Sequence, residues 1–182
     1  MNKKEINEII MAIWNLKGER LRQITRGGSM ACLGFGENLK AKVAYRSKSG
    51  KLDLRETVSS KYAVHICGFF RITHQGKIVL SNNDMYRPNS QMQNDDFDED
   101  NFDWDIEGNN KFDEQKKFFY DTDLLVQDII INELGDLKIV LSDGFCIEVF
   151  IDTNEDEECW RFFEVGNSEK PHIVITGQGC CE

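Results

Sequence analysis

The clearest structural signal in the chain is the stretch DLKIVLSDGFCIEVFI, from Asp136 to Ile151. Apolar and polar residues alternate on both sides of Ser142-Asp143-Gly144, which is typical of two strands joined by a short turn. A two-residue turn would set Ile139 against Glu148, whereas a three-residue turn with its glycine in the left-handed conformation sets Ile139 against Ile147. We therefore predict the longer turn. The same register pairs Leu141 with Phe145, Leu137 with Val149 and Lys138 with Glu148.

The N-terminal residues have the spacing of an amphipathic helix. Asn2 and Glu5 are placed as in a capping box, and Gly18 is a suitable stop. From Ser29 onward, short apolar runs divided by Gly, Asn and Asp indicate strands and turns. We predict an α+β fold in which the N-terminal helix packs on largely antiparallel sheets, within a single domain covering residues 1–182. The apolar face of the helix comprises Ile6, Ile9, Ile10, Ile13 and Leu16.

Two regions of the chain share a similar order of residues. The phrase CGFFRI at 67–72 is followed by KIVLS at 77–81, and ECWRFFEV at 158–165 is followed by HIVITG at 172–177. The similarity indicates an internal duplication of a β-hairpin unit, unless it is only the likeness common to antiparallel hairpins. The two β-rich halves would cover residues 29–83 and 124–177.

An acidic insertion separates these two halves at about residues 84–116. It contains eight acidic residues and no basic residue from Asp95 to Glu107. Such a block repels itself and lacks apolar residues for a core, so we expect a mobile loop. Aromatic residues within it supply contact area that a purely solubilising segment does not need. The predicted partner-binding residues are Asp96, Asp98, Asp100, Phe102, Asp103, Trp104, Asp105 and Glu107, with Phe97 as a further aromatic residue.

Charge is distributed unevenly along the chain. The formal net charge of −10 combines +7 over residues 1–62 with −17 over residues 63–182. This acidic balance argues against nucleic acid and against an anionic membrane as partners, and leaves a basic protein partner. No segment approaches the roughly 20 apolar residues of a membrane helix, and no apolar signal core follows Met1. We expect a cytoplasmic protein whose six cysteines are reduced thiols.

Calcium binding is an alternative role for the acidic insertion. An EF-hand loop places oxygen ligands at positions 1, 3, 5 and 12 and a sharp turn at position 6. Both registers that partly fit have a polar residue at position 8, where the pattern has an apolar one. Partial matches of this kind arise by chance in an Asp-rich segment. The registers are Asp96, Asp98, Asp100 and Glu107, and Asp103, Asp105, Glu107 and Glu114 with Gly108 at the turn position.

The sequence contains no complete catalytic or metal-binding motif. No Cys and His residues have the close spacing of a zinc site. Cys67 and Cys159 lie beside aromatic residues in predicted core strands, where burial raises the pKa of a thiol and makes it a poor nucleophile. We therefore predict no catalytic residue, metal or cofactor. An enzyme site assembled around His65, Cys67 and Cys159 remains an alternative.

The C-terminal third carries a family resemblance. The phrases LKIVLSDG at 137–144, ECWRFF at 158–163 and HIVITG at 172–177 resemble small uncharacterised bacterial proteins, some of which are similar to immunity proteins of polymorphic toxin systems. The resemblance implies a protein that neutralises a toxin domain by stoichiometric binding. It implies no active site. Our leading hypothesis is a non-enzymatic protein-binding module, an immunity-type inhibitor whose acidic insertion attracts a basic partner.

Overall fold

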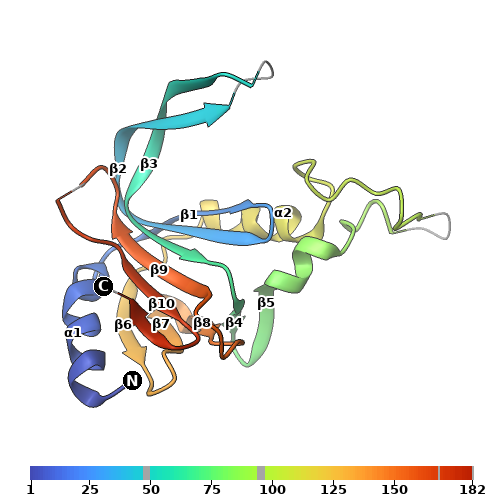
Figure 1. The fold of residues 1–182 in the computed structure, drawn as a ribbon. Coiled ribbons are helices and arrows are strands. Elements are labelled where there is room, and N and C mark those ends of the chain that lie inside the picture. Colours follow the sequence, from blue (N-terminus) through green and yellow to red (C-terminus); the bar gives the residue numbers. More distant parts are fainter. Residues whose placement is uncertain (47–49, 94–96, 168, 182) are drawn as a thin grey trace.

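The computed structural model describes residues 1–46, 50–93, 97–167 and 169–181, and for residues 41–46 and 55 it describes the backbone alone. Figure 1 shows an N-terminal helix beside two β-sheets. The six-stranded sheet has the order β1 (Leu21–Gly27), β2 (Met30–Arg46), β3 (Leu52–Ile66), β9 (Glu158–Glu164), β10 (Ile173–Thr176) and β11 (Gly179–Cys181). The five-stranded sheet has the order β5 (Lys77–Ser81), β4 (Phe69–His74), β8 (Phe145–Phe150), β7 (Leu137–Leu141) and β6 (Val126–Ile131). Every described pairing is antiparallel, so the predicted α+β fold is confirmed.

The strand order repeats in the two halves of the chain, with the sheets exchanged. The hairpin β2–β3 leads from the six-stranded sheet into β4–β5 of the other sheet. The hairpin β7–β8 leads from the five-stranded sheet into β9–β10 of the first. At the centre, β3 pairs with β9 and β4 pairs with β8. These two pairings are equivalent, because β3 and β4 of the first half correspond to β8 and β9 of the second half. The two phrases that indicated a duplication therefore occupy equivalent strands, β4–β5 and β9–β10.

The central hairpin has the predicted register. Leu137 pairs with Val149, and Ile139 pairs with Ile147. The turn contains the short helix η4 (Ser142–Gly144), with Gly144 at φ 77°. Asp143 also has a positive φ of 56°. Aspartate tolerates this region because its short polar side chain bonds locally, so the turn uses two left-handed residues instead of one.

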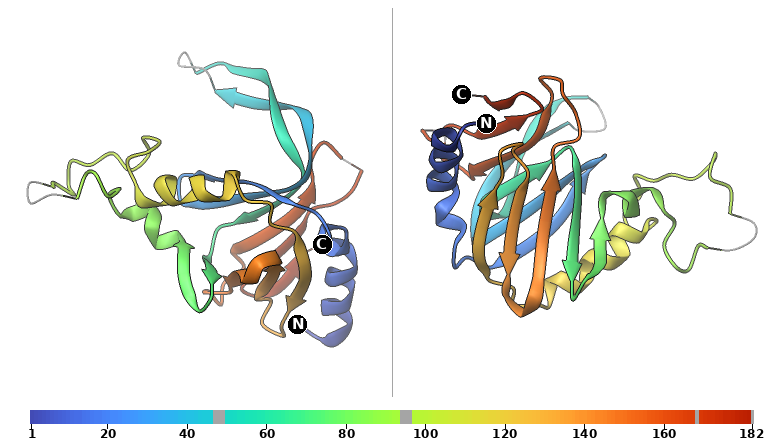
Figure 2. Two further views of the ribbon diagram at one scale, coloured as in Figure 1. Left: turned by 180° about the vertical axis from the view of Figure 1, so that it is seen from behind. Right: turned by 90° about the horizontal axis from the view of Figure 1, so that it is seen from below.

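The N-terminal helix α1 (Lys3–Ile13) also follows its sequence signals. The Asn2 side chain accepts the backbone N–H of Glu5, and the Glu5 carboxylate accepts the N–H of Asn2, which completes the capping box. The helix continues as η1 (Trp14–Leu16) and stops before Gly18, which has φ 86°. Its buried face packs beside β6 at the edge of the five-stranded sheet (Figure 2) and joins the core. Among the described residues, no helix combines the length and apolar character that crossing a membrane demands.

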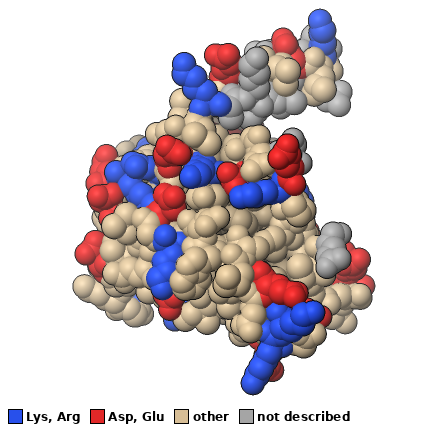
Figure 3. All heavy atoms as spheres, turned by 90° about the vertical axis from the view of Figure 1, so that its left-hand side faces the viewer, with Lys and Arg blue, Asp and Glu red and all other residues tan. Residues whose placement is uncertain are grey.

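The distal parts of β2 and β3 leave the body as a two-stranded ribbon. β1 pairs with β2 only as far as Phe35, and β9 pairs with β3 only from Tyr62 onward. Beyond these residues the two strands pair with each other alone, from Asn38 opposite Ser60 to Arg46 opposite Leu52. We call residues 38–46 and 50–60 the arm. Figure 3 shows the arm standing away from the rest of the molecule.

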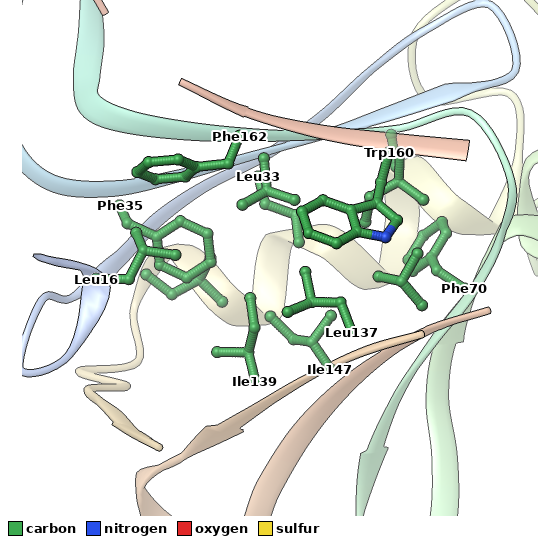
Figure 4. Close-up of a cluster of buried hydrophobic side chains, with 14 of the residues drawn as sticks. Leu16, Leu33, Phe35, Phe70, Leu137, Ile139, Ile147, Trp160 and Phe162 are labelled. Carbon is green, nitrogen blue, oxygen red and sulfur yellow. The ribbon is translucent and has the colours of Figure 1, made fainter. Parts of the chain in front are cut away.

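The core lies between the two sheets. Phe35, Trp160 and Phe162 point inward from the six-stranded sheet toward Ile139 and Ile147 of the other sheet (Figure 4). Each fully buried side chain of this size contributes about 1.5–3 kcal/mol by leaving water. The described apolar residues of both sheets and of α1 form one continuous buried cluster. The sandwich therefore provides a rigid base for the segments that project from it.

Part of the acidic insertion belongs to this core, which corrects a prediction. The chain leaves β5 through η2 (Asn82–Tyr86) and returns through α2 (Lys111–Gln115) and η3 (Lys116–Tyr120). Phe112 in α2 is fully buried and makes an edge-to-face contact with Phe70 of β4, with 6.3 Å between ring centroids. Met85 in η2 is part of the same buried cluster, so the expectation that residues 84–116 as a whole stay outside the core is wrong at both ends. Between η2 and α2, residues 87–93 and 97–109 are exposed or partly exposed, and Asn110 is buried (Figure 1).

Candidate functional site

The exposed part of the insertion is folded into tight turns by its own carboxylates. The Asp98 side chain accepts hydrogen bonds from the Asp100 backbone N–H at 3.1 Å and from the Asn101 side chain at 2.7 Å. The bond from Asn101 lowers the pKa of Asp98, so this group stays charged. Asp103 accepts the backbone N–H of Asp105 at 3.0 Å. Asp98, Asp100 and Asp103 are exposed, as predicted, and Asp96 lies outside the described residues.

Four aromatic side chains gather beside these carboxylates. The ring centroids of Phe97 and Phe102 are 4.9 Å apart, and those of Phe102 and Trp104 are 4.5 Å apart. Tyr86 of η2 adds a fourth ring, 6.5 Å from Trp104. We call these four residues the aromatic cluster. The rings shield one another partly, but Phe97, Phe102 and Trp104 stay half-buried and Tyr86 is exposed, so the cluster presents apolar area to solvent.

An ionic network holds the base of the insertion on the body. Arg26 in β1 donates to the backbone carbonyl of Trp104 at 2.5 Å and to the Asp113 carboxylate at 3.3 Å. Lys116 donates to the other oxygen of Asp113 at 2.8 Å. The side chains of Arg26, Asp113 and Lys116 are only 8%, 2% and 6% exposed. One buried carboxylate thus bridges two buried cations, and we call these three residues the buried ion triad.

Electrostatics keep the triad charged near neutral pH. Burial alone would raise the pKa of Asp113, but hydrogen bonds from Lys116, the Gly108 backbone and Arg26 outweigh it and lower that pKa. Burial alone would lower the pKa of Lys116, but the bond to Asp113 and the nearby Glu107 keep it raised. Each shift favours the charged form, so the triad persists as ions.

Two predicted partner-binding residues prove to have partners within the chain. Asp105 lies 3.7 Å from Arg26, and Glu107 lies 3.2 Å from Lys116. Their side chains remain 85% and 84% exposed, so water still reaches both carboxylates. The pairing within the chain does not test whether these two acids also contact a partner, so that stays a prediction. Asp98, Asp100 and Asp103 carry the free surface charge, while Asp105 and Glu107 also complete the attachment of the insertion.

The residues of the triad were not found from the sequence. Arg26 is 87 positions away from Asp113 in the chain, and nothing in the local pattern links them. The one available signal was Asn110, which lies three residues before Asp113. The side chain of Asn110 caps α2 by accepting the backbone N–H of Asp113 at 2.9 Å. A capped helix start within the insertion indicated that this end was ordered.

The surroundings of Cys67 and Cys159 raise the pKa of both thiols. Cys159 is buried, as predicted, but Cys67 is exposed, because it lies where the chain passes from β3 to β4. Partial burial and then the charge of Glu158 raise the pKa of the Cys67 thiol. Glu158 is itself paired with Arg161. These surroundings favour the thiol over the reactive thiolate, although the prediction that Cys67 is a core residue is wrong.

We expect Cys67 to react with a thiol reagent at pH 7 at least about threefold more slowly than an unstructured cysteine peptide does, because its thiolate fraction is small. Glu158→Gln should accelerate the reaction, since it removes the negative charge that faces the sulfur. Mass spectrometry of the labelled peptide measures both rates. Labelling of Cys67 faster than the peptide would reveal an activated cysteine and revive the enzyme alternative.

The second calcium register is not assembled in the structure. Glu107 is engaged by Lys116, and Glu114 accepts the hydroxyl and the backbone N–H of Ser90. Over the ranges that the structure describes, no three His, Cys, Asp or Glu residues converge in a way that could hold a metal ion. Gly108 does turn with φ 91°, but its N–H bonds to Asp113. The first register includes Asp96, which is outside these ranges.

Comparisons with protein-family models, with curated proteins and with solved structures find no match to this chain.

Proposed function

We propose that the protein is a non-enzymatic binding module that engages a basic protein partner through Asp98, Asp100, Asp103 and the aromatic cluster. The observation that carries the proposal is the placement of half-buried aromatic rings among exposed carboxylates, on a segment anchored by the buried ion triad. Aromatic side chains commonly supply most of the binding energy of an interface, and surrounding charges increase the rate of association. An anchored segment also loses less conformational entropy on binding.

An immunity-type inhibitor of a toxin domain is the particular role that we propose. The support is the resemblance of the C-terminal phrases to small bacterial proteins of that kind, together with the acidic, aromatic surface. An inhibitor of this type acts by occupying its target, so it requires a rigid interface and no catalytic group. The raised pKa of Cys67 is consistent with this role, because it disfavours a nucleophile.

Truncation of one aromatic ring tests the proposal. A partner captured from the native host is purified and titrated against Trp104→Ala, which is expected to weaken the affinity by about 2–4 kcal/mol, or roughly 30- to 1000-fold. The substitution leaves the backbone carbonyl of residue 104, which receives Arg26 and Asn110, in place. The loss should therefore come from the aromatic cluster and not from release of the Arg26 or Asn110 hydrogen bond.

The matched control is Phe118→Ala, which removes another exposed aromatic ring, from η3. It should leave the affinity within about threefold of the unmodified chain. Affinity should also fall steeply with added salt, and Asp100→Lys should reduce the salt dependence. Equal affinities of the Trp104→Ala variant and the unmodified chain would exclude the aromatic cluster as the binding surface.

A further inference from the structure

The arm is a structural element without lateral support in the body of the molecule. In the described part of the chain, no strand pairs with the outer edge of residues 38–46 or with that of residues 52–60. An isolated two-stranded ribbon is only marginally stable in water, and its open edges and faces tend to bind other chains. The arm therefore has the properties of a surface that is covered in an assembly.

One face of the arm is apolar and exposed. Leu52, Leu54 and Val58 are 65%, 64% and 55% exposed. They are separated by even numbers of residues in β3, so they point to the same face of the ribbon. Lys40, directly across the ladder from Val58, is also exposed. This face thus combines aliphatic contact area with the positive charge of Lys40 and the negative charge of Glu56, which is exposed and lies between Leu54 and Val58.

The arm and the acidic insertion have opposite charge within one chain. The arm contains five basic and two acidic residues, whereas residues 95–107 contain eight acidic residues and no basic one. The two segments project from the body in different directions (Figures 1 and 2). Each carries exposed apolar side chains beside its charges, aliphatic on the arm and aromatic on the insertion. The surface most complementary to the arm is therefore found on the same protein.

We infer that the arm of one copy of this chain docks on the acidic insertion and aromatic cluster of a second copy. Two reciprocal contacts of this kind close a symmetric dimer in which both projecting segments are covered. A nucleic acid is disfavoured as the occupant, because the net charge of −10 and the acidic insertion repel phosphates. The inference goes beyond the proposed function. It implies that self-association and the basic partner compete for the aromatic cluster.

Sedimentation velocity of the purified full-length chain tests the inference. We expect a monomer–dimer equilibrium between about 1 and 100 µM that shifts to the dimer at about 20 mM salt and to the monomer at about 500 mM salt. Leu54→Ser should weaken the dimer without changing the charge. A chain that stays monomeric over this whole range at low salt would overturn the inference.

Charge reversal at exposed positions of each segment provides the decisive part of the experiment. One variant carries Lys40→Glu and Lys51→Glu in the arm, and the other carries Glu99→Lys and Asp100→Lys in the insertion. All four residues are exposed. The substitutions keep the hydrogen bonds by which Asp98 and Asp103 hold the turns of the insertion. The net charge of the arm changes from +3 to −1 in the first variant, and that of residues 95–107 changes from −8 to −4 in the second. Each variant should therefore dimerise at least about tenfold more weakly than the unmodified chain.

Circular dichroism of each variant verifies the fold before these comparisons. A variant of either segment that dimerises as tightly as the unmodified chain would show that this segment is not a contacting surface. Fluorescence anisotropy with labelled duplex DNA and with an RNA hairpin is the second measurement. Binding of either one that is lost in the arm variant would overturn the inference in favour of a nucleic acid. The purified chain alone is used, so failure here leaves the proposed function untouched.

Discussion

Replacing Asp113 with asparagine is expected to lower the free energy of unfolding by about 3–5 kcal/mol. The side chain is almost fully buried and bridges two cations that are themselves buried, Arg26 and Lys116. Asparagine keeps the shape but removes the charge, so both cations remain in a region of low dielectric without their shared counter-ion. The exposed carboxylates of Asp105 and Glu107 cannot replace it, because water screens their charge.

Urea denaturation of the unmodified chain and of Asp113→Asn measures this loss. The matched control is Asp100→Asn, which removes the same charge from an exposed position and should change stability by less than about 0.5 kcal/mol. Lys116→Met completes a double-mutant cycle, in which the double variant should lose clearly less than the sum of the two single losses. Additive losses would show that the two side chains do not act as a pair.

The pH dependence of the free energy of unfolding follows from the shifted pKa values of Asp113 and Lys116. The pKa of Asp113 is lowered in the folded state, so its contribution is present above its unfolded pKa of about 3.9 and is lost as pH falls through the folded value. The pKa of Lys116 is raised, so its contribution is complete below its unfolded pKa of about 10.4 and is lost as pH rises through the folded value. The stability difference between the unmodified chain and Asp113→Asn should therefore be constant from about pH 5 to 9 and shrink in acid.

The second large effect is expected for Trp160→Ala, which should lower the free energy of unfolding by about 3–5 kcal/mol. Trp160 in β9 is fully buried between the sheets, and its indole N–H donates to the backbone carbonyl of Gly135 at 2.9 Å. Alanine leaves a cavity at the centre of the core and removes the donor from a buried carbonyl. Trp160→Phe fills most of the space and should lose less than alanine does.

Thermal and urea unfolding of these variants separates the packing loss from the hydrogen bond. Trp14→Ala is the control, because this indole is 45% exposed and lies against Lys17 at the surface. Trp14→Ala should lower the free energy of unfolding by less than about 1 kcal/mol. A similar loss for both tryptophans would contradict the assignment of Trp160 to the centre of the core.

Several elements could be predicted from the sequence because their causes are local. The register of the hairpin at 136–151 follows from alternation and from a turn that accepts positive φ at Gly144. The start of α1 follows from the paired capping of Asn2 and Glu5. The equivalence of β4–β5 and β9–β10 was indicated by similar phrases, although the exchange of sheets between the two halves was not.

Other features could not be predicted because they depend on where the strands cross between sheets. Cys67 has apolar neighbours in sequence but lies outside both strands at the passage from β3 to β4, so it is exposed. The arm was not anticipated either, since the sequence of β2 and β3 does not show where their outer neighbours end. The candidate site was half predicted: its exposed acids and aromatic residues were identified, and its anchoring residues were missed.

By itself, the sequence determined the helix α1, the central hairpin and the acidic, aromatic character of the insertion, because periodicity, capping and composition act over a few residues. The strands β1 and β11, outside the two predicted halves, were not indicated. Only the tertiary structure decided which of the many charged residues became buried ions. Arg26 meets Asp113 of α2 because η3, which follows α2 directly in the chain, packs against β1. A buried charge requires a partner at hydrogen-bonding distance, and that distance is set by the packing of segments that are remote in the chain.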